Sequence, residues 1–336
     1  MHQQIRITTG ARLQFGFLAD PHSSRRTCGG LGLMIDQPRY RLTLRRVSGS
    51  TSDAEVRDDV GELNGANISP DAMQRIAHWI DLYRQSHASP VPSCECLVEE
   101  TIPQHRGLGS GTQGALAVAQ GLAFLSGAHG ESIEQLARRV GRGARSAIGI
   151  HGFQQGGLLV DGGKANRDAI GSLLIREEIP HDWRFLLVTP PDREGISGRD
   201  EQNAFSALPQ MPLALTEQLC RLVLLEIVPA VQEADATRFG EAVTEYGRAV
   251  GNYFSPIQGG AFADPQMSQL ADDLHGEGVT GIAQSSWGPT ICVVCPNDVN
   301  ARELRERIRT DQRYANAHLQ IARGLNSGAV VEFIDS

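Results

Sequence analysis

The spacing of apolar and polar residues along the chain predicts both strands and helices. Residues 39–47 alternate, with an apolar side chain at every second position, which is typical of a half-buried strand. Residues 69–87 instead place apolar side chains at helical spacing. They begin with Ser69, a residue type that caps helices, and Pro70, which favours the first helical position. The pattern therefore predicts a strand followed by an amphipathic helix.

The same reasoning extends over the rest of the chain. Further strands are predicted at 5–9, 94–102, 156–163, 184–189, 290–295 and 329–335, and further helices at 115–127, 132–140, 216–232, 236–250, 264–275 and 297–310. A polar loop that contains prolines is expected after residue 189. Because the composition changes near residue 172, we predict two domains, 1–172 and 173–336. The second would be a split β-α-β unit that ends with the last strand.

Composition and charge exclude several classes of function. The 336 residues include 31 Lys and Arg against 39 Asp and Glu, a net charge of −8, which argues against a basic nucleic-acid-binding protein. No run of about 18 apolar residues is long enough to span a membrane, and the first ten residues lack the pattern of a signal peptide. We therefore expect a cytoplasmic protein that binds neither nucleic acid nor membrane.

The six cysteines do not predict a metal site. Cys292 and Cys295 lie three apart in a predicted strand, so their side chains point to opposite faces and cannot share an ion. Cys94 and Cys96 share a face, but no second pair and no histidine cluster lies near them in the sequence. Free cysteines usually act as small buried side chains, and a reducing compartment keeps them as thiols.

The most informative segment is a glycine-rich stretch, residues 103–113, between a predicted strand and a predicted helix. Its glycines let another group approach the bare backbone, and the helix directs free N–H groups and the positive end of its dipole into the loop. Such a loop is suited to phosphate, although a glycine-rich turn between a strand and a helix, taken alone, is as often structural. Lys164 is the only lysine in the chain, so the lysine of a standard P-loop enzyme is absent. We assign phosphate binding to Gly107, Leu108, Gly109, Ser110, Gly111, Thr112 and Gln113.

Three motifs together resemble those of a known superfamily. Residues 103–110 read P-x-x-x-G-L-G-S, which is similar to the phosphate-binding loop of the galactokinase, homoserine kinase, mevalonate kinase and phosphomevalonate kinase (GHMP) superfamily. Residues 145–157 resemble its middle motif, and residues 285–290 its late glycine-rich motif. The resemblance implies an α+β fold with an α/β N-terminal domain, 1–172, and a ferredoxin-like C-terminal domain, 173–336.

One departure separates this chain from the kinases. Their middle motif runs Ser-Gly-x-Asp, and that Asp commonly deprotonates the substrate hydroxyl, whereas residues 146–149 place Gly149 at this point. Loss of a general base costs about 10²- to 10⁴-fold in rate, so phosphoryl transfer is disfavoured. Over nearly its whole length the chain instead resembles the β-ribofuranosylaminobenzene 5′-phosphate synthases, which are non-kinase members of the superfamily.

This second resemblance implies a reaction that needs no such base. The synthases join phosphoribosyl pyrophosphate to 4-aminobenzoate, with 4-hydroxybenzoate as a near analogue, and release CO2 and pyrophosphate in tetrahydromethanopterin biosynthesis. The site must then supply hydrogen-bond donors for the leaving diphosphate and negative charge near the oxocarbenium-like sugar. The implied partners are these small molecules, with Mg²⁺ expected alongside the diphosphate and no organic cofactor. A homodimer is left open.

Candidate catalytic residues lie in a charged loop early in the chain, which we expect to be exposed. Asp20 is assigned to the developing sugar cation, and Arg26 to a carboxylate or phosphate that it can bind with two hydrogen bonds. Gly29 and Gly30 are assigned to the substrate site as residues that shape the backbone of this loop.

The late motif supplies further candidates. In the superfamily it closes the substrate site from the second domain, so Ser285, Ser286 and Gly288 are assigned to substrate binding by resemblance. Four polar residues beside the motifs could also bind phosphate, although each alone is more often structural: His105, Arg106, Arg145 and His151.

Two other functions remain open from the sequence. The first is an ATP-dependent small-molecule kinase of the same superfamily that draws its base from elsewhere. The second is an inactive relative that binds ligands, against which the polar residues Asp20, Arg26, Ser110 and Thr112 argue.

Overall fold

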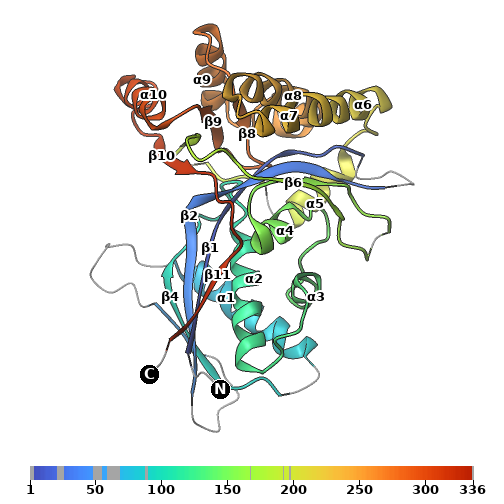
Figure 1. Ribbon diagram of the computed structural model, residues 1–336, viewed down its shortest axis with the longest axis vertical. Coiled ribbons are helices and arrows are strands. Elements are labelled where there is room, and N and C mark those ends of the chain that lie inside the picture. Colours follow the sequence, from blue (N-terminus) through green and yellow to red (C-terminus); the bar gives the residue numbers. More distant parts are fainter. Residues whose placement is uncertain are drawn as a thin grey trace.

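The computed structural model describes residues 4–20, 26–47, 55–58, 69–87, 90–166, 168–191, 193–196 and 198–334. A long sheet with helices on one face forms the lower part of the molecule in Figure 1, and a smaller sheet with a group of long helices lies above it. This mixed content and the division into two layered parts agree with the α+β prediction. None of the described helices is both long and apolar enough to cross a membrane.

The first sheet is built around two long antiparallel strands, β1 (Gln4–Gly16) and β2 (Gly30–Arg46). Its order is β11-β1-β2-β4-β3, and β5 also pairs with β2 and carries β6 at its other edge. The remaining strands are β3 (Glu55–Asp58), β4 (Cys94–Glu100), β5 (Leu158–Asp161), β6 (Leu173–Glu177) and β11 (Val330–Ile334). The strands predicted from residues 5–9, 39–47, 94–102 and 156–163 are therefore all present in this sheet.

Helices α1 (Pro70–Ser86), α2 (Ser110–Leu125), α3 (Ile133–Arg139) and α4 (Ile148–Gln155) accompany this sheet. Ser69 caps α1 as predicted, because its side chain accepts a hydrogen bond from the Ala72 amide. α2 consists mostly of small residues and is buried along nearly its whole length, so it packs closely against its neighbours. The sheet and α1 thereby hold the first turn of α2 in a fixed position.

The second sheet is antiparallel and has the order β10-β7-β9-β8. Its strands are β7 (Arg184–Thr189), β8 (Ile282–Gln284), β9 (Ile291–Cys295) and β10 (His318–Arg323). Its helices are α6 (Leu213–Leu222), α7 (Val228–Gln232), α8 (Ala236–Gln258), α9 (Pro265–Gly276) and α10 (Asp298–Thr310). Cys292 and Cys295 lie on opposite faces of β9, in two different apolar clusters, as their spacing predicts.

Several helix predictions need correction. The helix predicted over 216–232 is divided by a π-helical turn, η1 (Val223–Ile227), between α6 and α7. The helix predicted over 236–250 continues to Gln258, past Pro256. The loop predicted after residue 189 contains α5 (Gly198–Ala207), whose polar composition hides the few apolar positions that it buries.

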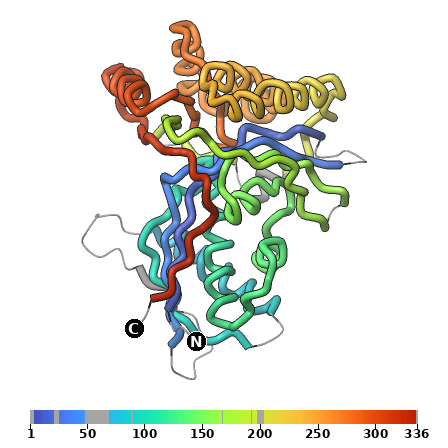
Figure 2. The backbone as a smooth tube through the Cα atoms, in the orientation of Figure 1, coloured from blue at the N-terminus to red at the C-terminus, as the bar shows by residue number. Residues whose placement is uncertain are grey.

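The prediction that the last strand completes the second domain is wrong. β11 pairs antiparallel with β1, from Gln4 opposite Ile334 to Thr8 opposite Val330. Figure 2 shows the end of the chain running back along the first sheet, so that both termini lie at the same end of the molecule. β6 likewise pairs with β5 in the first sheet. The boundary between 172 and 173 stays a prediction, and both sheets draw strands from the chain beyond it.

Candidate active site

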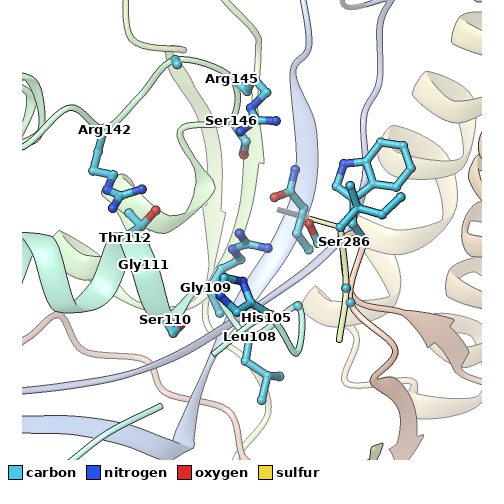
Figure 3. Close-up of a pocket in the computed structure, with 18 of the residues that line it drawn as sticks. His105, Leu108, Gly109, Ser110, Gly111, Thr112, Arg142, Arg145, Ser146 and Ser286 are labelled. Carbon is cyan, nitrogen blue, oxygen red and sulfur yellow. The ribbon is translucent and has the colours of Figure 1, made fainter. Parts of the chain in front are cut away.

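A cavity of about 530 Å³ lies where the first turn of α2 meets the loop between β8 and β9 of the second sheet. Loops from several parts of the chain line it, among them the glycine-rich loop before α2, the connection between α3 and α4, and the loop that precedes β9. Figure 3 shows Gly109, Ser110 and Thr112 from the first loop, Arg142 and Ser146 from the second and Ser286 from the third around one space. The three motifs singled out in the sequence therefore meet at a single site.

The predicted phosphate-binding loop ends on a helix whose first amides are directed at the cavity. Gly109 is the N-cap of α2, has a left-handed conformation with φ of 76°, and offers no side chain to cap the helix. Its carbonyl accepts hydrogen bonds from the amides of Thr112 and Gln113. An N-terminus that lines a cavity without a capping side chain is suited to an anion.

Replacing Gly109 by valine is expected to abolish binding of phosphoribosyl pyrophosphate. The φ of Gly109 strains any side chain, and a Cβ there would lie 3.1 Å from Cβ and 3.2 Å from Nε of Arg12, which also lines the cavity. Isothermal titration with phosphoribosyl pyrophosphate and with pyrophosphate measures the loss. Wild-type affinity in a folded variant would contradict the placement of the diphosphate.

Two glycines of different motifs face each other where the loops meet. A Cβ at Gly107 would lie 2.1 Å from the Ser285 carbonyl oxygen, and a Cβ at Gly288 would lie 2.2 Å from the Gly107 nitrogen. The buried Ser285 hydroxyl donates a hydrogen bond to the Gly107 carbonyl at 2.7 Å and accepts one from the backbone N–H of Gln14 at 3.1 Å. Backbone contact between the loops thus explains why both motifs contain glycine here.

The cavity carries much more positive charge than the sequence motifs indicated. Arg12 of β1, Arg75 of α1, and Arg142 and Arg145 of the α3–α4 connection all line it, and no Asp or Glu occurs among the described residues that do. A Cβ at Gly111 would lie 2.8 Å from Nη2 of Arg75 and 3.4 Å from Nη1 of Arg142. Two guanidinium groups therefore flank the first turn of α2.

Sequence reasoning missed Arg12, Arg75 and Arg142. Arg75 also donates to the Gln104 side chain at 2.6 Å, which connects α1 to the phosphate-binding loop. Both Arg75 and Arg142 lie over the Trp79 ring, with their guanidinium carbons 5.5 Å and 5.6 Å from its centre. These arginines come from separate elements, so no local pattern could have identified them as a group.

The structure places most, but not all, of the residues assigned to phosphate and substrate binding at the cavity. Gln113 is fully buried, accepts a hydrogen bond from Thr9 at 2.7 Å and donates to the Gly149 carbonyl at 2.8 Å, so its side chain supports the loop from behind. Gly30 begins β2, Gly29 directly precedes it, and neither lines the cavity. The assigned residues that line it are Gly107, Leu108, Gly109, Ser110, Gly111, Thr112, Ser286 and Gly288.

Asp20 and Arg26 are not among the residues that line the cavity. Asp20 is buried, with 6% of its surface exposed, and accepts a hydrogen bond from the Met211 amide at 3.2 Å. The expectation that Asp20 is exposed is therefore wrong, because the chain after β1 packs beneath the segment that leads into α6. Arg26 is exposed and donates to the carbonyls of Gly162 at 2.7 Å and Gly163 at 2.8 Å. Their catalytic roles stay predictions.

The polar residues beside the motifs divide into two groups. His105 and Arg145 line the cavity. Arg106 donates to carbonyl oxygens of residues 190, 191 and 193, and His151 is buried with its Nε2 2.8 Å from the Gly171 carbonyl. Arg106 and His151 therefore support loops.

The middle motif lies beside the first turn of α2. A Cβ at Gly149 would lie 3.2 Å from the Thr112 side chain, so the kinase carboxylate would project toward that turn. The nearby carboxylate is Asp161, which is fully buried and accepts hydrogen bonds from the Ala147 amide at 2.7 Å and the Gly163 amide at 2.8 Å. Burial raises the pKa of Asp161, and the carboxylate anchors the start of α4 without lining the cavity.

Comparisons with known proteins agree with this geometry. The family described as GHMP kinases N terminal domain matches residues 74–154, and GHMP kinases C terminal matches residues 227–313. A β-ribofuranosylphenol 5′-phosphate synthase of Methanothermobacter thermautotrophicus is 29% identical over 86% of this chain and 88% of its own. A protein of the same name from Archaeoglobus fulgidus is 27% identical over 98% of this chain and 99% of its own.

Solved structures share the fold at low sequence identity. A homoserine kinase from Cytophaga hutchinsonii superposes with a TM-score of 0.66 at 15% identity, covering 99% of this chain and 98% of its own. A mevalonate diphosphate decarboxylase from Staphylococcus aureus gives 0.69 at 13% identity, with the same coverage of each chain. The two family models and the archaeal relatives confirm the resemblance read from the motifs: the chain belongs to the GHMP kinase superfamily, and it is an enzyme related to the β-ribofuranosylphenol 5′-phosphate synthases.

Proposed function

We propose that this enzyme joins phosphoribosyl pyrophosphate to 4-hydroxybenzoate or 4-aminobenzoate and releases CO2 and pyrophosphate. The observation that carries the proposal is the charge of the cavity, where four arginines and the N-terminus of α2 converge and the described lining contains no carboxylate. Such a site favours a polyanion with a diphosphate group. The name of the archaeal relatives, which specifies a ribofuranosylphenol phosphate, favours an aromatic acceptor.

In the proposed reaction, pyrophosphate is displaced from C1 of the sugar and CO2 from the aromatic ring. The C1–O bond of the sugar breaks, and pyrophosphate leaves with the electron pair. The ring carbon that bears the carboxylate, para to the hydroxyl or amino group, then bonds to C1. The bond from that carbon to the carboxylate breaks, its electron pair restores the aromatic ring, and CO2 leaves. Because no proton is removed from a hydroxyl, the lack of a carboxylate at position 149 is no obstacle, and the arginines beside the first turn of α2, Arg12, Arg75 and Arg142, stabilise the charge on the departing pyrophosphate.

Mg²⁺ is proposed to enter as part of the substrate, bound to the diphosphate oxygens. Mg²⁺ is commonly held by carboxylates together with substrate phosphates. In the described part of the chain, no group of three or more His, Cys, Asp or Glu side chains is arranged to hold a metal ion. The described lining of the cavity contains no Asp or Glu, which supports delivery of Mg²⁺ together with the diphosphate.

An incubation with Mg²⁺, phosphoribosyl pyrophosphate and carboxyl-labelled acid tests the proposal. We expect labelled CO2 and pyrophosphate in equal amounts, and none of either when the phosphoribosyl donor is omitted. Absence of CO2 release with both acids would overturn the proposal, and binding of both substrates without turnover would identify an inactive relative. The physiological setting that we propose is tetrahydromethanopterin biosynthesis in the cytoplasm.

The enzyme is not expected to phosphorylate homoserine, mevalonate or galactose with ATP. The physical reason is Gly149, together with the absence of Asp and Glu from the described lining, which leaves no carboxylate to accept a hydroxyl proton. A coupled assay of ADP release measures this. Stoichiometric ADP formation with any of the three alcohols would favour the kinase alternative.

A further inference from the structure

We propose that the cavity has a separate end for the aromatic acid, where Phe17 and Trp287 contact the ring and Arg145 binds the carboxylate. This inference rests on the proposed function, because it names the place of the second substrate. The cavity then contains two kinds of arginine: those that flank the glycine-rich loop before α2, and Arg145, which lies against an aromatic cluster.

The aromatic cluster connects the cavity to the second layer. Phe17 and Trp287 both line the cavity and keep only 6% of their surface exposed. Phe205 lies behind them, with its ring centre 5.5 Å from that of Phe17 and 5.2 Å from that of Trp287, both in edge-on geometry. Phe254 packs against Trp287 at 4.7 Å. A cluster fixed by so many ring contacts gives a rigid apolar wall that suits a flat ring.

Arg145 is the arginine that belongs to this wall. Its guanidinium carbon lies 5.0 Å from the centre of the Phe205 ring, and the residue is half-buried and lines the cavity. By contrast, Arg75 and Arg142 lie over Trp79, which belongs to the apolar cluster of the first sheet, whereas Phe205 belongs to another. Figure 3 shows Arg142 near Thr112 and Arg145 near Ser146, apart from each other. Arg145 thus contacts a different aromatic cluster from the one that Arg75 and Arg142 contact.

This arrangement matches the chemistry of an aromatic monocarboxylate. The ring needs an apolar surface, and the carboxylate needs a planar cation that can give two hydrogen bonds, which a guanidinium supplies. The carboxylate loses its charge as CO2 forms, so an interaction with Arg145 stabilises the bound acid more than the transition state. Loss of Arg145 is therefore expected to raise the KM for the acid without lowering kcat.

The test compares 4-hydroxybenzoate with 4-hydroxybenzamide, which keeps the ring and lacks the charge. Binding of each is measured by titration to the wild type and to Arg145→Gln, with pyrophosphate as a third ligand. We expect the wild type to prefer the acid by about tenfold or more, as for one charge-assisted hydrogen-bonded pair, and Arg145→Gln to show nearly equal affinities. Pyrophosphate affinity should stay near the wild-type value in this variant.

A second measurement locates the ring without changing the arginine. The chain has three tryptophans, and Trp287 is the one at the proposed acid end. Quenching of tryptophan fluorescence by 4-hydroxybenzoate should be lost in Trp287→Phe and kept in Trp79→Phe. Quenching that persists in Trp287→Phe would contradict the placement.

Arg302→Gln is the matched control for Arg145→Gln. Arg302 lies on α10, is largely exposed and donates to Asp298, so its replacement removes the same charge far from the cavity. An unchanged preference for the acid in Arg145→Gln, or a parallel loss of pyrophosphate affinity, would overturn the inference. Because these readouts are binding measurements, they are independent of turnover, and failure of the proposed function would appear separately as absence of labelled CO2.

Discussion

Replacing Arg75 and Arg142 together by glutamine is expected to weaken pyrophosphate binding by about 10²-fold or more. A hydrogen bond to a charged group contributes about 1.5–3 kcal/mol, so each arginine alone should account for about tenfold or more. Both guanidinium groups lie within 3.4 Å of the position that a Cβ would take at Gly111, on the first turn of α2. They can therefore act on one diphosphate together with the helix amides.

Titration calorimetry of the two single variants, the double variant and Arg302→Gln measures this prediction. The cycle also gives the coupling between Arg75 and Arg142, which should be appreciable because they face the same ligand. Thermal unfolding is the folding control, since both arginines lie over Trp79 and such contacts contribute about 0.5–1 kcal/mol each. A folded double variant with wild-type pyrophosphate affinity would show that the diphosphate binds elsewhere.

Gly288→Ala is expected to lower turnover by about 10²-fold or more, because a displacement of about 1 Å in a site can have that effect. The added methyl group would lie 2.2 Å from the Gly107 nitrogen and 2.4 Å from the Arg106 carbonyl oxygen, distances that force the two loops apart. Ser286 and Trp287 belong to the displaced loop and line the cavity, so the shape of the cavity would change. Turnover and melting temperature are the measurements.

Gly130→Ala provides the control for Gly288→Ala. A Cβ at Gly130 would have no heavy atom within 4 Å, and the residue has no left-handed conformation. We expect wild-type turnover in this variant. Combining Gly107→Ala with Gly288→Ala should be little worse than either change alone, because one separation of the loops relieves both contacts. Gly288→Ala with wild-type turnover would show that the contact between the loops is unimportant for the site.

The local sequence determined the elements that depend on short-range contacts. Ser69 caps α1, Asp264 caps α9, and Ser132 and Gln135 form a reciprocal capping box at α3, each within one helical turn. The glycine-rich loop before α2 could be identified for the same reason. The phosphate binding predicted for it depends on glycines and helix amides that are adjacent in the chain.

The tertiary structure alone decided which distant residues share the site. Arg12, Arg75 and Arg142 come from a strand, a helix and a connection, and each by itself resembles an ordinary surface arginine in the sequence. Phe17 and Trp287 likewise could not be grouped from the sequence, because they lie 270 positions apart, yet both line the cavity. Packing of the two layers against each other brings these side chains together, and no short-range pattern encodes it.

Strand pairing shows the same division between sequence and structure. The apolar composition predicted residues 329–335 as a strand, but its partner is β1 at the opposite end of the chain, and the hydrogen bonds of a sheet can join segments at any sequence separation. Asp20 was likewise visible as a carboxylate, and only the fold showed that it is buried against the Met211 amide. The sequence by itself therefore determined most of the helices, the glycine-rich loop before α2 and the family. The tertiary structure decided the charge and shape of the cavity, because these depend on contacts between residues far apart in the chain.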